Sequence, residues 1–206
     1  MGVPKLRPDG IGPLLDRRTA PLNHLAEHAI EVAKACHAMA IRFHRGGKLI
    51  VFGNGGPSTD AQHIAVEFVH PVIVGKRALP AISLTSDVAT LTGIANRVGL
   101  AETFAHQLRF LGEPADIALG LSTDGRCANV LRGLEQAGEL GMLRVALVGG
   151  DGGTIADRGL ADHLLVAAST DPLVVKEVHV TMYHVLWELV HVFFEQPGVL
   201  DPGVVR

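Results

Sequence analysis

Short apolar runs alternate along this chain with segments in which apolar residues recur at helical spacing. The compact runs predict strands at residues 48–52, 81–85, 116–121, 143–148 and 162–166. The helically spaced segments predict helices at about residues 58–70, 87–96, 102–111, 126–140, 153–158 and 172–195. Apolar strands that alternate with helices are typical of a parallel sheet covered on both faces. The pattern therefore predicts an α/β fold, and such a sheet binds ligands at the carboxyl ends of its strands.

The two ends of the chain differ from this middle part. Residues 1–13 are rich in proline and glycine, and we expect a flexible N-terminal arm there. Residues 14–45 have a helical pattern, which Pro21 should divide into two helices. No second domain or internal repeat is visible. We therefore expect one domain at residues 14–197, with the N-terminal helices included, and a C-terminal tail at 198–206.

Composition and charge narrow the classes of function. Apolar residues make up 48% and charged residues 19% of the 206 positions, which excludes a mostly disordered protein. The net charge of -3 gives no electrostatic case for binding nucleic acid or an anionic membrane. No run reaches the roughly 18 apolar residues of a membrane span, no secretory signal is visible, and two cysteines form no disulfide framework. We expect a cytoplasmic protein with no nucleic-acid or membrane partner.

A glycine-rich turn follows the first predicted strand. It runs from Gly53 through Asn54, Gly55 and Gly56 and leads into the next helix. Free backbone N–H groups and the positive end of a helix dipole make such a turn suitable for an anion. The turn matches neither the phosphate loop of nucleotide hydrolases nor the dinucleotide fingerprint. A turn with a purely structural purpose is the alternative interpretation.

A second polar turn, at Ser122, Thr123 and Asp124, follows the third predicted strand and leads into a helix. Hydroxyl and N–H groups at a helix N-terminus would bind a phosphate. The Asp124 carboxylate would repel the phosphate unless Arg126 points inward to compensate. Ordinary helix capping is the alternative. Two such turns at the same edge of one sheet nevertheless indicate a shared ligand site.

One side of the helix after the glycine turn carries four polar residues, Asp60, His63, Glu67 and His70. His63 and Glu67 stand one turn apart, a spacing that can place both on one metal ion or both on one substrate. The polar outer face of an amphipathic helix is the alternative interpretation.

The last predicted helix is apolar almost all round, which indicates that it is buried. One polar stripe interrupts it and consists of Glu177, Thr181, His184, Glu188 and His191. A buried polar stripe needs hydrogen-bond partners, a metal or a wet cavity. We therefore expect His184 to line a site, and a polar seam between subunits is the alternative.

Together these motifs resemble the phosphoheptose isomerase family of the sugar isomerase (SIS) superfamily, over about residues 14–195. The motifs that carry the resemblance are Gly53-Asn54-Gly55-Gly56 with His63 and Glu67, Asn96, Ser122-Thr123, Gly150-Asp151-Gly152-Gly153, and Glu177-Val178-His179 with His184. The resemblance implies the SIS fold, a flavodoxin-like five-stranded parallel sheet with an N-terminal helical arm. It also implies a homotetramer with active sites at subunit interfaces. The implied reaction is isomerisation of a sugar phosphate, with sedoheptulose 7-phosphate as the first candidate, through an enediol.

The resemblance also implies roles for individual residues. Glu67 would be the base that removes a proton from carbon, and His184 would be its acid/base partner. His63, Glu67 and His184 would bind zinc together with a glutamine of the family. The residues expected to bind substrate are Asn54, Gly55, Gly56, Asn96, Arg97, Ser122, Thr123, Asp124, Cys127 and Lys176.

This chain departs from the family pattern at several positions. The zinc-binding glutamine is replaced by Lys176, and a charged lysine is a poor zinc ligand, which leaves three ligands plus water. Serines expected around the phosphate are replaced by Pro57, Asp124 and Cys127, and the aspartate of an Asn-Asp pair by Arg97. Either charge replaces hydroxyl groups at the phosphate, or the substrate differs. Two alternatives follow, an isomerase of another sugar and a non-catalytic SIS protein that binds a sugar phosphate or a protein partner.

Overall fold

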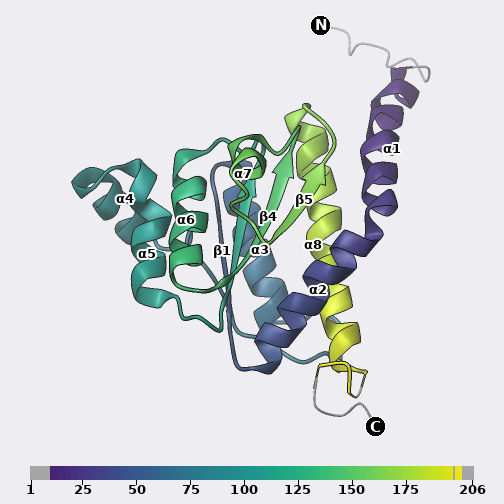
Figure 1. The fold of residues 1–206 in the computed structure, drawn as a ribbon. Coiled ribbons are helices and arrows are strands. Elements are labelled where there is room, and N and C mark those ends of the chain that lie inside the picture. Colours follow the sequence, from purple (N-terminus) through teal and green to yellow (C-terminus); the bar gives the residue numbers. More distant parts are fainter. Residues whose placement is uncertain (1–9, 197, 201–206) are drawn as a thin grey trace, which may run out of the picture.

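Five parallel strands form one sheet at the centre of the protein (Figure 1). The computed structural model describes residues 10–196 and 198–200. The strands are β1 (Leu49–Gly53), β2 (Ala81–Ser83), β3 (Ile117–Ser122), β4 (Leu143–Gly149) and β5 (His163–Ala167). Their order is β2-β1-β3-β4-β5, and all neighbours pair in parallel. The predicted α/β fold is confirmed, and β2 ends earlier than expected.

Helices connect the strands and cover both faces of the sheet (Figure 1). They are α1 (Gly12–Glu27), α2 (Ala29–His44), α3 (Gly56–Val69), α4 (Val88–Arg97), α5 (Thr103–Leu111), α6 (Ala128–Glu139), α7 (Gly153–Asp157) and α8 (Pro172–Phe194), with a 3-10 turn at Leu100–Glu102. Most of the expected flexible arm and C-terminal tail lies outside the described residues, at 1–9 and 201–206.

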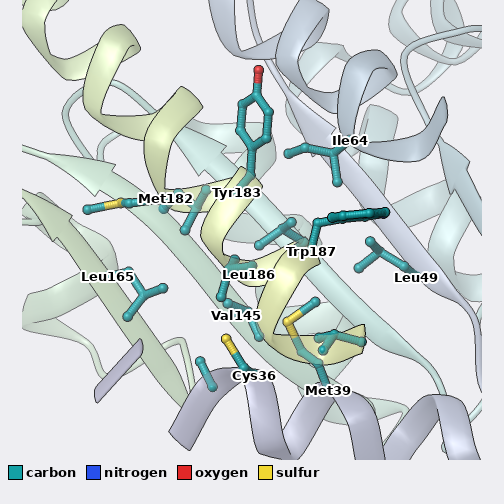
Figure 2. Packing of buried hydrophobic residues seen from close by; sticks show 14 of the residues in the cluster. Cys36, Met39, Leu49, Ile64, Val145, Leu165, Met182, Tyr183, Leu186 and Trp187 are labelled. Carbon is teal, nitrogen blue, oxygen red and sulfur yellow. The ribbon is translucent and has the colours of Figure 1, made fainter. Parts of the chain in front are cut away.

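Alternate residues of β1 point to opposite faces of the sheet, and each face has its own apolar core. Leu49 and Val51 belong to a core with α2, α3 and α8, whereas Ile50 and Phe52 belong to a core with α5 and α6. Figure 2 shows part of the first core, in which side chains of α8 and the sheet lie above α2. Burial on both faces explains why the strands are apolar throughout.

The predicted division of the first helix at Pro21 is wrong. α1 runs from Gly12 to Glu27 with Pro21 inside it. A proline inside a helix lacks one backbone hydrogen bond, but Pro21 is buried, and the packing of its ring offsets that loss. The chain breaks later, at His28, where the backbone (φ -101°, ψ 24°) departs from helical values between α1 and α2.

One face of α8 packs against the sheet, α2 and α3, and the opposite face reaches solvent in the single chain. Glu177, Thr181, His184 and Glu188 are exposed there, so the expectation of a buried stripe is wrong for these four residues. His191, the last member, is buried. Val180, Val185 and Leu189 are only partly buried, so within a single chain one side of α8 is left uncovered. In the described part of the chain, no helix is long and apolar enough to cross a membrane.

Candidate active site

Three side chains converge where α3 and α8 pack together. His63 and Glu67 lie one turn apart on α3, and His184 meets them from α8. The Nε2 atom of His63 is 3.2 Å from Oε1 of Glu67, and the ring centroids of His63 and His184 are 5.4 Å apart. One ligand atom from each residue lies within 4.8 Å of the other two. We refer to these three residues as the His–Glu–His cluster.

The cluster contains the groups that two kinds of chemistry require. A carboxylate and an imidazole can transfer protons near neutral pH. Two imidazoles and a carboxylate are also a donor set for zinc, with a fourth position left for water or substrate. Glu67 is half-buried and the two histidines are exposed, so a metal ion or a small molecule can reach all three.

Two aromatic residues of α8 hold the α3 side of the cluster in place. The hydroxyl of Tyr183 is 3.0 Å from Nδ1 of His63, and the indole N–H of Trp187 donates to the backbone carbonyl of Glu67 at 2.9 Å. Burial raises the pKa of Tyr183 to about 12, and the charges of Asp60 and Glu67 add to the effect. Sequence reasoning treated both aromatic residues as apolar. A buried Tyr or Trp usually finds a hydrogen-bond partner, and this rule could have pointed to the two contacts with α3.

The side chain of Lys176, on α8, reaches the first turns of α3 and donates hydrogen bonds to several oxygen atoms there. Its Nζ atom is 2.6 Å from Oδ1 of Asp60, 3.2 Å from the Gly56 carbonyl and 3.3 Å from the Thr59 hydroxyl. The side chain of Asp60 is only 5% exposed. The three donors of the ammonium group are therefore engaged. Lys176 is not available as a fourth metal ligand beside the His–Glu–His cluster.

The glycine turn between β1 and α3 borders a cavity of about 280 Å³, which we call the Asn54 cavity. Gly55 has a φ of 63°, a left-handed backbone that favours glycine. The polar residues that line the cavity are Asn54, Ser58, Thr85, Thr92, Thr103 and Asn129. The side-chain amides of Asn54 and Asn129 bond to each other, with N···O distances of 2.6 Å and 2.9 Å. The strand order reverses between β1 and β3, which is the usual ligand site of such a sheet.

Two hydroxyl groups in the first turn of α3 form hydrogen bonds within that turn. Pro57 lies in this turn, where the missing N–H is not needed. The hydroxyls of Ser58 and Thr59 donate to the carbonyl oxygens of Gly55 and Gly56, each at 2.7 Å. No hydroxyl is present at position 57, and the two that follow are already hydrogen-bonded.

The second polar turn, after β3, is closed by its own hydrogen bonds. The Ser122 hydroxyl accepts from the Gly125 N–H at 3.0 Å, and the Asp124 carboxylate accepts from the Arg126 N–H at 2.9 Å. The Arg126 guanidinium bonds to Asp151, at 3.2 Å. The pKa of Asp151 is lowered by the Gly153 N–H and then by Arg126. The guanidinium thus contacts the backbone carbonyl of Asp124 and the carboxylate of Asp151, and among the described residues it forms no ion pair with the Asp124 carboxylate.

The remaining predicted substrate residues lie apart from one another. Thr123 and Asp124 line a separate hollow of about 840 Å³, and Arg97 lines a third one beside α4. Asn96 is exposed, and Cys127 is half-buried at the start of α6. The residues that line the Asn54 cavity include neither these five nor the members of the His–Glu–His cluster. Within one chain, the structure brings together the cluster and, separately, Asn54 and Gly55.

Comparison with known proteins identifies relatives over most of the chain. A family model described as SIS domain matches residues 16–149. The phosphoheptose isomerase of Desulfovibrio desulfuricans is 39% identical over 178 residues, which cover 86% of this chain and 84% of the relative. That of Roseiflexus sp. is 43% identical over 148 residues, or 72% and 74% of the two chains. The chain belongs to the phosphoheptose isomerase family.

Solved structures agree with this family assignment. A phosphoheptose isomerase from Francisella tularensis has a TM-score of 0.84 and 31% identity, and covers 89% of this chain and 97% of its own. The corresponding structure from Neisseria gonorrhoeae has a TM-score of 0.81 and 29% identity, with 88% and 97% covered. The resemblance and the SIS fold expected from the motifs are confirmed.

Proposed function

We propose that this protein interconverts the ketose and aldose forms of a phosphorylated sugar, and that sedoheptulose 7-phosphate is its substrate. The observation that carries the proposal is the His–Glu–His cluster, in which a carboxylate and two imidazoles lie within 4.8 Å of one another. The relatives are named phosphoheptose isomerases, which fits this reaction. A protein that only bound a sugar phosphate would have no need of an acid and a base at such a short distance.

The reaction moves one proton between neighbouring carbon atoms through an enediol. Glu67 would take a proton from C1 of the ketose, and the electron pair of that C–H bond would form the C1–C2 double bond. The carbonyl oxygen on C2 would meanwhile gain a proton from His184. In the second half, protonated Glu67 would return its proton to C2, and His184 would take the proton of the C1 hydroxyl. Both groups then recover their starting protonation states.

His63, Glu67 and His184 are also the residues that would hold a zinc ion. Their atom types and mutual distances suit zinc, and three protein ligands with an open position are typical of catalytic zinc sites. Lys176, at the place of the family glutamine, is engaged with Asp60 and adds no ligand. When bound, zinc would polarise the sugar oxygen atoms and stabilise negative charge on the enediolate.

We further propose that the sugar phosphate occupies the Asn54 cavity and that the protein works as a homotetramer with composite sites. The lining of the cavity does not include the His–Glu–His cluster of the same chain, which fits a site completed by a neighbouring copy. An apolar groove between α1 and α8, lined in part by Leu22, Val185 and Leu189, offers surface for such a contact. Light scattering after gel filtration tests this, and a monomer would contradict it.

The decisive experiment follows hydrogen exchange at carbon. Wild-type protein with sedoheptulose 7-phosphate in D₂O should lose the C1 proton signal in the NMR spectrum. Glu67→Gln should slow this exchange by about 10² to 10⁴-fold, the usual contribution of a general base. Glu139→Gln, an exposed carboxylate at the end of α6, is the matched control and should keep the wild-type rate.

Two outcomes would change the assignment. Wild-type exchange of the C1 proton in Glu67→Gln would contradict the proposed mechanism. If wild-type protein exchanged no proton of any phosphorylated or free sugar in a panel, the non-catalytic alternative would stand. The observations that favour this alternative are Pro57 and Asp124, which replace expected hydroxyl groups by a ring and by a negative charge.

A further inference from the structure

Tyr183 connects the apolar core to the His–Glu–His cluster. Its side chain is buried, and its ring meets the His63 ring edge to face with centroids 5.4 Å apart. Its hydroxyl is 3.0 Å from Nδ1 of His63. Figure 2 shows the Tyr183 ring beside Ile64, with the hydroxyl directed away from the other labelled core residues. The hydroxyl is thus the polar end of a side chain whose ring is fixed by packing.

The two nitrogen atoms of His63 face different partners. Nδ1 faces the Tyr183 hydroxyl, and Nε2 faces the Glu67 carboxylate at 3.2 Å. A neutral imidazole has one N–H donor and one acceptor nitrogen, whereas an ionised carboxylate only accepts. The pairing with Glu67 therefore requires the proton on Nε2, and Nδ1 must then accept a hydrogen bond. The Tyr183 hydroxyl supplies it.

We propose that Tyr183 is a positioning residue whose hydroxyl holds Nδ1 of His63 and thereby directs Nε2 to the centre of the His–Glu–His cluster. The side chain of His63 is 43% exposed, so loss of the Tyr183 contact would leave its ring less firmly held. A hydroxyl can also reverse its role and accept from Nδ1–H, which is the arrangement needed when Nε2 binds a metal. Phenylalanine would keep the ring packing and lose both arrangements.

The inference rests on the proposed function where it concerns zinc, but its geometric content can be tested without zinc or sugar. In metal-free, ¹⁵N-histidine-labelled wild-type protein, the NMR spectrum of neutral His63 should show the proton on Nε2 and a hydrogen-bonded Nδ1. Tyr183→Phe should shift the Nδ1 resonance toward that of a nitrogen without a hydrogen bond. A His63→Gln spectrum assigns the signals.

Zinc affinity gives the second readout. In a competition titration with a chelator, Tyr183→Phe should bind Zn²⁺ about 10 to 100-fold more weakly than wild type, the usual effect of losing the partner of a ligating histidine. Met182→Leu is the matched control, because Met182 is equally buried on α8 and makes no polar contact with the cluster. It should keep both the Nδ1 resonance and the wild-type zinc affinity.

The outcomes separate this inference from the proposed function. A Nδ1 resonance that does not change in Tyr183→Phe would overturn the positioning role. If Tyr183→Phe failed to fold, a wild-type spectrum with the proton on Nδ1 would overturn it as well, and a proton on Nε2 would support it. If wild type neither bound Zn²⁺ nor isomerised a sugar but Nδ1 moved in Tyr183→Phe, the positioning role would stand and the proposed function would fail.

Discussion

Replacement of Lys176 by methionine tests the ion pair that joins α8 to the first turns of α3. Methionine keeps most of the aliphatic stem of lysine and removes the ammonium group. Asp60 would then lose its partner at 2.6 Å, while its second oxygen, Oδ2, already has no hydrogen-bond partner among the described residues. The substitution therefore leaves a buried carboxylate without compensation.

The size of the effect follows from the exposure of the two side chains. Removing one partner of a fully buried ion pair costs about 3–5 kcal/mol, whereas an exposed pair contributes about 0–1 kcal/mol. Asp60 is 5% exposed and Lys176 is 40% exposed, so the pair lies between these limits and water can reach the place that the ammonium group leaves. We expect Lys176→Met to lower the free energy of unfolding by about 2 kcal/mol.

The assay is urea denaturation of four proteins, namely wild type, Lys176→Met, Asp60→Asn and the double variant, at one protomer concentration because assembly adds to apparent stability. In the Asp60→Asn background, Lys176→Met should lower the free energy of unfolding by less than about 0.5 kcal/mol, because no buried carboxylate is left without a partner. A cost below about 0.5 kcal/mol in the wild-type background, or equal costs in both backgrounds, would refute the reasoning.

Two further predictions concern other buried polar groups. Burial lowers the pKa of His179 below its ordinary value of 6.5, so the folded protein binds this proton less readily than the unfolded chain. The stability that neutral His179 contributes is full above about pH 6.5 and is lost as the pH falls toward the folded pKa. At pH values below about 6.5, the urea concentration at the unfolding midpoint should therefore decrease in wild type and decrease less steeply in His179→Gln. Equal slopes in the two proteins would contradict this. Asn129→Ala removes the partner of the Asn54 amide and a bond to the Thr103 hydroxyl. It should destabilise the protein by about 1–3 kcal/mol and raise KM more than it lowers kcat, whereas unchanged stability and KM would show that the pair is dispensable.

The fold could be predicted from the sequence because its signals are local. Each strand is a compact apolar run, and each face of the sheet is buried, so the pattern along 143–148 already describes β4 (Leu143–Gly149). The error at Pro21 has a different origin. The local rule that proline interrupts a helix was overridden by packing of the ring, and no local pattern shows what a side chain will pack against.

The site could be predicted only in part. The spacing of His63 and Glu67 places them on one face of a helix, and this is visible in the sequence. Their meeting with His184 came from the family resemblance, because it depends on the register between α3 and α8. The contact between Tyr183 and His63 depends on the same register and spans 120 residues of sequence. Sequence periodicity assigned Tyr183 to the apolar face of α8, and its ring is indeed buried. Periodicity does not predict which partner the hydroxyl group contacts.

Two of the residues that the family resemblance singled out as departures meet at the start of α3. Pro57 lies in the first turn of α3, and Lys176 reaches the same turn through the Gly56 carbonyl and the Thr59 hydroxyl. His63 contacts Glu67 and Tyr183 further along the same helix. A helix N-terminus favours anions through its first-turn N–H groups, whereas the ammonium group of Lys176 is already paired with the Asp60 carboxylate. On the proposed function, substitutions at this turn should therefore change substrate selectivity more than they change proton transfer by Glu67 and His184.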